Sequence, residues 1–346
     1  MATWPDILMR LSFDENLEAS DTAWMLNEVF EGRATDAQLG AFLMGMQTKG
    51  ATATEVSGMV DTMLEHAARI DVPGRAVDIV GTGGDKANTV NISTMASLVI
   101  AGAGLRVVKH GSRAASSTTG SSDVLAALGI NLDIKPARVV EILDEVGITF
   151  CFAPTFHPAM RFAGPVRKEL GIPTIFNVLG PLTNPAQPAV SAIGAASAQL
   201  APVMAEVLAM RGRDAIVFRN DDGLDELAAT STTTVWEVRG GVVERSTIDA
   251  VADLGLHPIP VSALTGGESN ENAAVARSVL AGEGGPIRET VIANAAIALA
   301  VDGTLPGTAE GTLVERMRSG MRAAAYAIDS GAADATLQRW AKATQS

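Results

Sequence analysis

Two glycine-containing loops, each directly after a short apolar run, constrain the fold of this 346-residue chain more than any other feature. The first loop, Gly81-Thr82-Gly83-Gly84-Asp85, follows the run 77–80, and the second, 109–113 (Lys-His-Gly-Ser-Arg), follows the run 105–108. Between them, residues 91–94 (Asn-Ile-Ser-Thr) open a stretch rich in Ala, Met and Leu that predicts a helix. The pattern of strand, glycine loop, helix, strand and cationic loop indicates an α/β fold.

Both loops have the character of a phosphate cradle. Backbone amides freed by glycine, together with unpaired N–H groups at a helix start, bind anions without many charged side chains. Neither loop meets the dinucleotide spacing G-x-G-x-x-G or the P-loop pattern. A lone glycine turn after a strand often serves only tight packing, so the pairing of the two loops is what favours a ligand that carries phosphate at both ends.

Composition limits the classes of partner. The formal net charge of −13 and the pI near 4.8 argue against broad affinity for nucleic acid. Cys151 is the only cysteine, which excludes an intrachain disulfide and a thiolate metal cluster. The first residues show no basic segment followed by an apolar core, and no apolar run has the roughly 18 residues of a membrane helix. We expect a soluble, cytoplasmic protein without a membrane partner.

The helical and alternating patterns divide the chain. Residues 1–68 predict helices only, with capping-box spacing at 35–38 and 52–55 and a start at Ser20-Asp21 for a helix over 22–30. A hinge at 71–75 contains Pro and Gly. Beyond it, strands and helices alternate, which predicts a mostly parallel sheet covered by helices. The strands are expected at 77–80, 106–108, 148–152, 215–219 and 233–238, and helices at 123–128 and 137–146, with 158–195 helix-like.

The motifs resemble those of the anthranilate phosphoribosyltransferase family. The similarity is carried by GTGGD, NIST, KHGSRAASS and FNVLGPLTNPA in that order, and it covers nearly the whole chain. It extends to GAFLMGMQTKG at 40–50, residues 157–174, DDGLDEL at 221–227, and the late motifs GGESNENAAVARSVL and VIANAA. Several motifs in family order are far more specific than any one glycine loop.

The resemblance implies a nucleoside-phosphorylase-like α/β fold, with a small all-helical domain beside a large α/β domain with a mostly parallel central sheet. The helical domain would comprise 1–70, joined in space by about 160–195, and the large phosphoribosyl-binding domain 76–159 and 196–346. The implied activity is transfer of the phosphoribosyl group of phosphoribosyl pyrophosphate to the amine of anthranilate, in tryptophan biosynthesis. Mg²⁺ is the implied cofactor, and a homodimer through the helical domain is implied as well.

The resemblance also assigns a donor site and a metal site. Adjacent acids on their own more often belong to a solvated loop, but Asp225 and Glu226 match the metal-binding pair of the family, and Ser93 matches its third metal contact. Mg²⁺ prefers such hard oxygen ligands. The residues implied in binding phosphoribosyl pyrophosphate are Gly81, Gly83, Gly84, Asp85, Thr89, Asn91, Ser93, Thr94, Lys109, Gly111, Arg113, Ser116, Ser117 and Ser121.

On the acceptor side, Arg167 matches the arginine of the family that pairs with the anthranilate carboxylate, although an arginine in a helical run is usually a surface residue. The full set implied in binding anthranilate is Gly81, His110, Ser112, His157, Arg167, Gly180 and Pro181. One residue departs from the family pattern K-H-G-N-R, because Ser112 stands at the asparagine position. A single hydroxyl does not replace the donors of an amide, so a weaker or shifted acceptor site is expected, by about 1 kcal/mol.

Two other functions share features of this sequence. A pyrimidine nucleoside phosphorylase has the same overall fold, but its Thr- and Lys-rich signature is not found here. A nucleic-acid-binding relative without transferase activity needs a basic surface, which the net charge of −13 opposes. No Ser–His–Asp arrangement is present that calls for a covalent nucleophile, so the expected chemistry depends on positioning and electrostatics.

Overall fold

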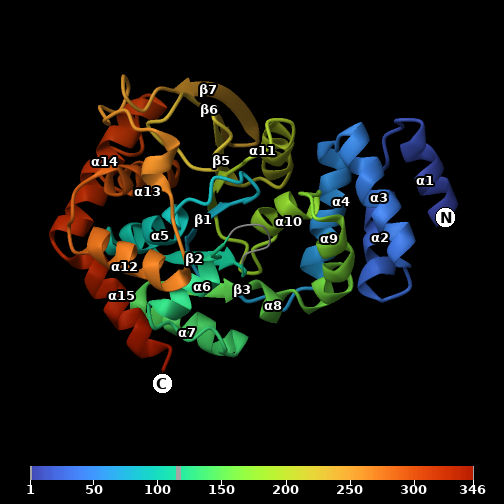
Figure 1. Ribbon diagram of the computed structural model, residues 1–346, viewed down its shortest axis with the longest axis horizontal. Helices are drawn as coiled ribbons and strands as arrows, with labels where there is room; N and C mark the ends of the chain where they lie inside the picture. Colours follow the sequence, from blue (N-terminus) through green and yellow to red (C-terminus); the bar gives the residue numbers. More distant parts are fainter. Residues whose placement is uncertain (1, 114–117, 346) are drawn as a thin grey trace.

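The computed structural model describes residues 2–113 and 118–345, which form an N-terminal group of helices beside a larger α/β domain (Figure 1). As predicted, the described residues up to 68 contain helices and no strand. The two predicted capping boxes are confirmed. The hydroxyl oxygens of Thr35 and Thr52 each accept the backbone N–H of the residue three positions later, and the backbone N–H of each threonine donates to the side chain of that same residue. The helices are α1 (Trp4–Ser12), α2 (Ala19–Phe30), α3 (Asp36–Lys49) and α4 (Ala53–Glu65).

The predicted start of the second helix is wrong by a few residues. Helix α2 begins at Ala19, and its N-cap is Glu18. The Asp21 carboxylate accepts the N–H of Glu18 at 3.1 Å, so Asp21 occupies the third helical position of a capping box. An acidic residue in the first turn also favours the helix dipole. The sequence Ser20-Asp21 therefore lies inside the helix that it was expected to cap.

A run of four short helices follows later in the chain, and all but the first contact the N-terminal helices. Val166 and Phe176 share one apolar core with Phe42 and Met59 of the N-terminal helices. Helix α9 contacts α3, and α10 contacts α4. The expectation that 158–195 is helix-like is wrong at its end, because Val190–Gly194 forms a strand of the sheet. The short helices are α8 (Ala153–Phe156), η1 (Pro158–Phe162), α9 (Gly164–Leu170) and α10 (Phe176–Leu182).

A seven-stranded sheet forms the centre of the α/β domain, in the order β3-β2-β1-β4-β5-β6-β7. The first five strands in this order are parallel, and β6 and β7 are antiparallel additions at one edge. The mostly parallel sheet is thus confirmed. The strands are β1 (Val77–Gly81), β2 (Val107–Gly111), β3 (Ile148–Phe152), β4 (Val190–Gly194), β5 (Asp214–Asn220), β6 (Thr233–Arg239) and β7 (Val242–Ile248).

The five predicted strands are found, while β4 and β7 were not predicted. Strand β4 reads Val-Ser-Ala-Ile-Gly and is buried along its whole length between β1 and β5. Such a short buried parallel strand lacks the alternation of polar and apolar residues that identifies a half-exposed one. Strand β7 is mostly exposed at the sheet edge and contains charged residues. Exposure on both faces removes the alternation of polar and apolar residues that would identify it as a strand.

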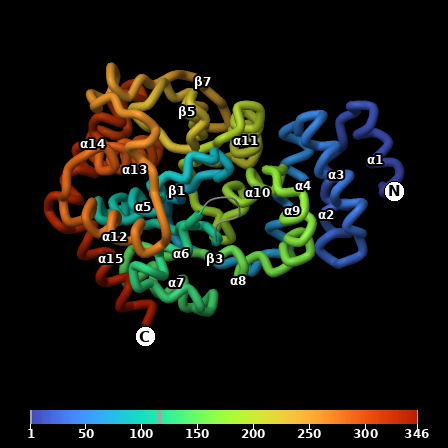
Figure 2. The backbone as a smooth tube through the Cα atoms, in the orientation of Figure 1, coloured from blue at the N-terminus to red at the C-terminus, as the bar shows by residue number. Residues whose placement is uncertain are grey.

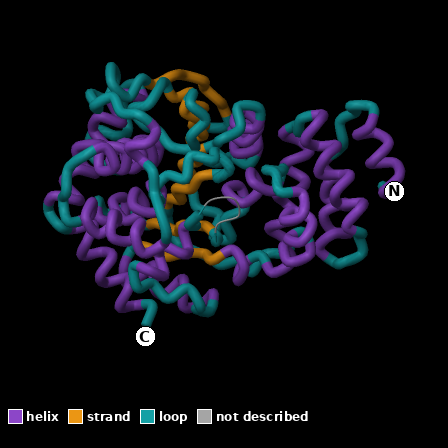
Figure 3. The backbone as a smooth tube through the Cα atoms, in the orientation of Figure 1, coloured by secondary structure: helices purple, strands orange, loops and turns teal. Residues whose placement is uncertain are grey.

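The two faces of the sheet belong to different cores, because successive side chains of a strand point to opposite sides. In β5, Ile216 and Phe218 join the core formed with α5 and α13, whereas Ala215 and Val217 join the core that includes α11 and the N-terminal helices. Figure 3 shows the strands running between these helical layers. The covering helices are α5 (Ile92–Gly102), α6 (Ser121–Ala127), α7 (Pro136–Val146), α11 (Leu200–Met210), η2 (Val261–Leu264), α12 (Ser269–Leu280), α13 (Pro286–Asp302), α14 (Leu313–Asp329) and α15 (Ala332–Ala343).

The chain ends in the α/β domain, on the far side from the helical group in which it begins (Figure 2). Within the described part of the chain, none of the helices combines the length and the apolar character needed to cross a membrane.

Candidate active site

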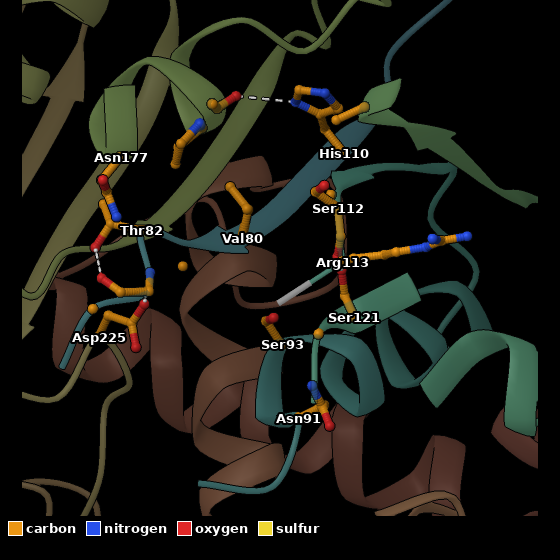
Figure 4. Close-up of a pocket in the computed structure, with 18 of the residues that line it drawn as sticks. Val80, Thr82, Asn91, Ser93, His110, Ser112, Arg113, Ser121, Asn177 and Asp225 are labelled. Carbon is orange, nitrogen blue, oxygen red and sulfur yellow. Dashed lines mark hydrogen bonds between the residues drawn. The ribbon is translucent and has the colours of Figure 1, made fainter. Parts of the chain in front are cut away.

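A cavity of about 550 Å³ lies where the ends of β1 and β2 face the helical group (Figure 4). The two strands are parallel neighbours and end at Gly81 and Gly111, so the loops that follow them emerge on the same side. Met63 of α4 and Phe176 of α10 complete the lining from the helical side. The volume is typical of a pocket for a small molecule.

Nearly all residues that the sequence implied for the site line this one cavity. Thr94 does not, because it is fully buried one position further into α5. Ser116 and Ser117 lie outside the described residues. The lining residues named from the sequence are Gly81, Gly83, Gly84, Asp85, Thr89, Asn91, Ser93, Lys109, His110, Gly111, Ser112, Arg113, Ser121, His157, Arg167, Gly180, Pro181, Asp225 and Glu226.

The first loop requires glycine for two different reasons. Gly83 and Gly84 have φ of +64° and +86°, in the left-handed region that side chains disfavour. A Cβ on Gly81 would overlap the carboxylate of Asp225. The N–H of Gly83 donates to Asp225 Oδ2 at 2.6 Å. The glycines therefore let the loop fold closely over the acidic pair.

Helix α5 begins at the cavity and is held there by two distant segments. Asn91 is its N-cap residue, but the side chain makes no capping bond. Instead, Asn91 Nδ2 donates to the carbonyl of Thr119 at 3.2 Å, and Asn91 Oδ1 accepts from Asn272 Nδ2 at 3.0 Å. The amide dipoles at the start of α5 thus remain available to an anion.

Lys109 is almost completely buried, and its ammonium points into the site. Its Nζ donates to the carbonyl of Ile79 at 2.5 Å and to Ser93 Oγ at 3.2 Å. Burial lowers the pKa of Lys109 to about 8, against the opposing charges of Asp78 and Asp225. Lys109 is therefore still mostly cationic at pH 7, in a place where a charge is poorly screened.

Arg113 differs from Lys109 in exposure. Its guanidinium lies over the ring of Phe152, 5.9 Å from the centroid, and the side chain is exposed. Figure 4 shows it directed away from Ser93 and Asp225. The structure thus brings the loop of Arg113 to the cavity but leaves the charged group at its rim.

Two neutral histidines form one wall. The ring centroids of His110 and His157 are 5.1 Å apart. Burial lowers the pKa of His110 to about 3 and that of His157 to about 4. His110 Nδ1 lies 3.0 Å from the carbonyl of Gly180, which can only accept, so Nδ1 carries the proton and Nε2 is a free acceptor. Nε2 is buried and has no partner among the described residues.

Arg167 lies on the wall formed by the helical group. It comes from α9, and its guanidinium lies 5.3 Å from the centroid of the Phe176 ring. Burial lowers its pKa, and among the described residues it forms neither an ion pair nor a hydrogen bond with an acidic side chain. A half-buried guanidinium without a counter-ion favours a carboxylate or phosphate ligand.

Three carboxylates gather where the glycine loop meets residues 225–226. Ligand atoms of Asp85, Asp225 and Glu226 lie within 4.8 Å of one another. Burial, followed by the charge of Asp85, raises the pKa of Asp225 to about 7, and burial raises that of Glu226 well above its ordinary value. Thr89 Oγ1 donates to Glu226 Oε1 at 3.0 Å. Asp225 was expected at a metal site, whereas Asp85 was expected only in the phosphate cradle.

This cluster fits a divalent cation. Asp85 Oδ2 and Glu226 Oε2 are buried and have no hydrogen-bond partner within the described chain. Buried carboxylates that repel one another are stabilised by a cation, and hard oxygen donors are the ligands that Mg²⁺ prefers. Ser93 Oγ, the expected third metal contact, accepts a hydrogen bond from Lys109 Nζ at 3.2 Å.

Several lining residues were not expected from the sequence. Asn177 lies in the motif FNVLGPLTNPA, and Thr82 lies inside GTGGD, so both were within quoted motifs without being assigned a role. Met160 and Arg161 likewise lie within the segment 157–174, and Met63 comes from a helical segment whose periodicity gives no sign of a site. Only the packing of the helical group against the sheet brings these residues to the cavity.

Comparison with known proteins identifies the family. Residues 5–67 match the helical bundle domain, and residues 73–334 the a/b domain, of a glycosyl transferase family. Over 343 residues the chain is 55% identical to an anthranilate phosphoribosyltransferase of Streptomyces griseus, covering 99% of this chain and 95% of that protein. The crystal structure of the enzyme of that name from Thermus thermophilus has 36% identity and a TM-score of 0.89, with coverage of 99% and 100%.

A second solved structure is the anthranilate phosphoribosyltransferase of Saccharomyces cerevisiae in complex with phosphoribosyl pyrophosphate and Mg. It has 26% identity and a TM-score of 0.88, and the match covers 99% of this chain and 98% of that one. Sequence motifs, domain models and fold agree along the whole length. The chain therefore belongs to the anthranilate phosphoribosyltransferase family of glycosyltransferases.

Proposed function

We propose that this cavity transfers the phosphoribosyl group of phosphoribosyl pyrophosphate to the amine of anthranilate, which yields N-(5-phosphoribosyl)anthranilate and pyrophosphate for tryptophan biosynthesis. The observation that carries the proposal is Arg167, a half-buried arginine that has no counter-ion among the described residues and lines the same cavity as two phosphate-type loops. A guanidinium fork pairs with a carboxylate through two parallel hydrogen bonds. An aromatic acid and a phosphorylated sugar fit these two ends.

The acceptor end holds anthranilate. Arg167 pairs with its carboxylate, while Phe176 keeps the guanidinium in place from the other side. His110 accepts an N–H of the aromatic amine at Nε2, because Nδ1 donates to the carbonyl of Gly180. His157, Gly180, Pro181 and Ser112 shape the remaining wall.

The donor end holds phosphoribosyl pyrophosphate. The backbone amides of Gly83 and Gly84, the start of α5 and the Lys109 ammonium provide donors to phosphate oxygens. Asp85, Asp225, Glu226 and Ser93 are the residues that would hold Mg²⁺, which supplies positive charge to neutralise the leaving pyrophosphate. The yeast relative solved with phosphoribosyl pyrophosphate and Mg supports this part of the proposal.

The reaction needs no protein nucleophile. As the bond to pyrophosphate breaks, positive charge builds on the anomeric carbon, and the neutral amine attacks it. The nitrogen is positively charged once the C–N bond forms, and it then loses one proton to water or to the departing pyrophosphate. The chain contributes by placing the amine beside that carbon and by offering fixed dipoles and Lys109 to the departing oxygens. Neutral His110 receives the hydrogen bond of the amine without competing for the phosphates as a cation.

We also infer a homodimer through the helical group. Met9 of α1, Phe13 at the C-cap of that helix and Met44 of α3 are 58%, 68% and 40% exposed, and α1 packs against α3. Met and Phe are enriched at protein–protein interfaces relative to the rest of the protein surface. We expect the wild type to have twice the mass of the chain in light scattering and Phe13→Glu to lower it. The cytoplasmic location stays a prediction from the sequence.

The reaction is tested by the loss of anthranilate fluorescence with purified protein, phosphoribosyl pyrophosphate and Mg²⁺. We expect consumption at micromolar anthranilate that EDTA abolishes. A parallel assay with thymidine and inorganic phosphate checks the phosphorylase alternative and is expected to show no product. If the protein binds phosphoribosyl pyrophosphate but does not consume anthranilate, the assignment of the donor site stands and the assignment of anthranilate as the acceptor is refuted.

A further inference from the structure

We propose that Asn294 is a positioning residue for the acidic pair Asp225 and Glu226, which it holds by bonding both backbone groups of the next residue, Leu227. The inference rests on the metal role proposed above for that pair. Leu227 N–H donates to Asn294 Oδ1 at 3.1 Å, and Asn294 Nδ2 donates to the carbonyl of Leu227 at 2.8 Å. The second Nδ2 hydrogen goes to the carbonyl of Thr290 at 2.8 Å.

Asn294 is an unusual residue for its helix. It is 2% exposed, in the middle of α13, where the residues on both sides are buried alanines. A buried amide is costly in such a place unless its hydrogen-bonding groups are satisfied. Here both amide hydrogens and the oxygen are used within the protein, so Asn294 has no free donor for a ligand. Its contribution must pass through Leu227.

The hydrogen bonds between Asn294 and Leu227 stabilise the loop after β5. Leu227 is fully buried, yet it lies outside the named strands, so the sheet does not pair its N–H and C=O. Buried backbone groups must be bonded, and Asn294 bonds both as a neighbouring strand would. On the other side of the acidic pair, a Cβ on Gly194 would overlap the carbonyl of Asp225. The backbone of the pair is thus fixed immediately before and after Glu226.

Fixing the backbone matters because the two carboxylates are held against their electrostatic preference. Their ligand atoms lie within 4.8 Å of one another and of an oxygen of Asp85, and negative charges this close repel one another and favour a move toward water. If Leu227 were released, the loop would relax outward and the oxygens would no longer converge. We therefore expect Asn294 to affect the affinity for a divalent cation more than the chemical step at saturating metal.

The test uses Asn294→Leu and Asn294→Ser in the full chain. Leucine keeps the approximate size and removes every bond, while serine is small enough to admit water if leucine prevents folding. Mn²⁺ binding is measured by electron paramagnetic resonance with phosphoribosyl pyrophosphate present and anthranilate absent. We expect the dissociation constant to rise about tenfold, as for other residues that orient metal ligands. We also expect the Mg²⁺ requirement to rise, with kcat at saturating Mg²⁺ within a few fold of the wild type.

Thr290→Val is the matched control. Thr290 is buried one turn earlier in α13, and its hydroxyl donates to the carbonyl of Pro286 at 2.8 Å, so its side-chain hydrogen bond stays within the helix. We expect it to lower the melting temperature and leave Mn²⁺ affinity unchanged. If the Asn294 variants bind Mn²⁺ with the same affinity as Thr290→Val, the positioning role of Asn294 is refuted, while the metal assignment of Asp225 and Glu226 stands. If the wild type binds no Mn²⁺, both the metal assignment and the inference are overturned.

Discussion

At the scale of single residues, Ser112 is where the chain departs from its family pattern. Ser112 lines the cavity directly after β2, the strand that carries His110 (Figure 4). An asparagine there would add an amide donor for the acceptor carboxylate. We expect Ser112→Asn to lower KM for anthranilate about fivefold, the equivalent of about 1 kcal/mol for one hydrogen bond. Steady-state kinetics check this, with Ser112→Ala as the control that adds no donor; an unchanged KM for Ser112→Asn would remove Ser112 from the acceptor site.

The acidic pair makes a residue-scale prediction of its own. Asp225→Asn with Glu226→Gln keeps an acceptor for the N–H of Gly83 and for the Thr89 hydroxyl but removes both charges. Without those charges the site loses its affinity for Mg²⁺, so we expect turnover to fall by at least about a hundredfold, as with other losses of electrostatic stabilisation. Initial rates over a Mg²⁺ titration measure the effect. Wild-type kinetics in this double variant would refute the metal assignment.

At the scale of elements, one glycine sets how closely α2 and α4 approach. A Cβ on Gly58 of α4 would overlap the carbonyl oxygen of Ala19 and come within 2.5 Å of Thr22 Oγ1. Alanine favours a helix by up to about 1 kcal/mol over glycine, but a clash with rigid backbone costs about 1–3 kcal/mol. We therefore expect Gly58→Ala to lower the melting temperature.

A glycine in α3 provides the control for that prediction. At Gly40 the nearest atom to an added Cβ is Val166 Cγ1 at 4.0 Å, which is ordinary contact. Gly40→Ala should therefore leave the melting temperature unchanged or raise it. Both variants are compared by thermal unfolding followed by circular dichroism. Equal shifts in the two variants would show that helix propensity, rather than the contact between α2 and α4, decides the outcome.

Much of the element pattern and of the site could be predicted from the sequence, because the motifs themselves follow strands. The glycine loop extends from the end of β1, and Lys109 lies near the end of β2, so parallel pairing alone brings both to one edge of the sheet. Asp225 and Glu226 follow β5 in the same sheet. The capping boxes of α3 and α4 each depend on two residues three positions apart, so the sequence alone predicts them.

Other features depend on contacts between distant segments and leave no local signal. Strand β4 has small and apolar residues like those of the neighbouring buried helices, and only its position between β1 and β5 makes it a strand. Asn294 follows a helical apolar pattern, so its bonds to Leu227 are invisible in the sequence. The same holds for Met63, which reaches the cavity because α4 packs beside it. Packing between segments far apart in the sequence determines the strand β4, the role of Asn294 and the place of Met63.

At the scale of the whole molecule, the helical group and the sheet share a core. Val217 of β5 and Leu208 of α11 belong to the same apolar cluster as Met59 of α4. The wall that carries Arg167 is therefore attached to the α/β domain through side chains that exclude water. This packing keeps the acceptor end facing the donor end, and it places the buried carboxylates far from bulk solvent.

Burying those carboxylates lowers the stability of the metal-free protein in a pH-dependent way. The pKa of Asp225 rises from its ordinary value of 3.8 to about 7, and that of Glu226 rises as well. Between these values the folded state holds protons that the unfolded state has released, so the free energy of unfolding falls as pH rises. His110 and His157, whose pKa values are lowered, act in the opposite direction below pH 6.5. A variant that keeps both histidines has the same contribution from them as the wild type, so this contribution cancels when the stabilities of the two proteins are compared.

We expect Asp225→Asn with Glu226→Gln to become more stable relative to the wild type as pH rises from 5 to 8 in EDTA. The difference should grow by about 1.4 kcal/mol per pH unit for each proton released. Urea unfolding of both proteins at each pH measures it, and the wild type at pH 5 is the reference. Mg²⁺ at pH 8 should stabilise the wild type and leave the variant unchanged, because only the wild type binds the ion. A stability difference that stays constant across this pH range would mean that the two carboxyl groups titrate normally in the folded protein.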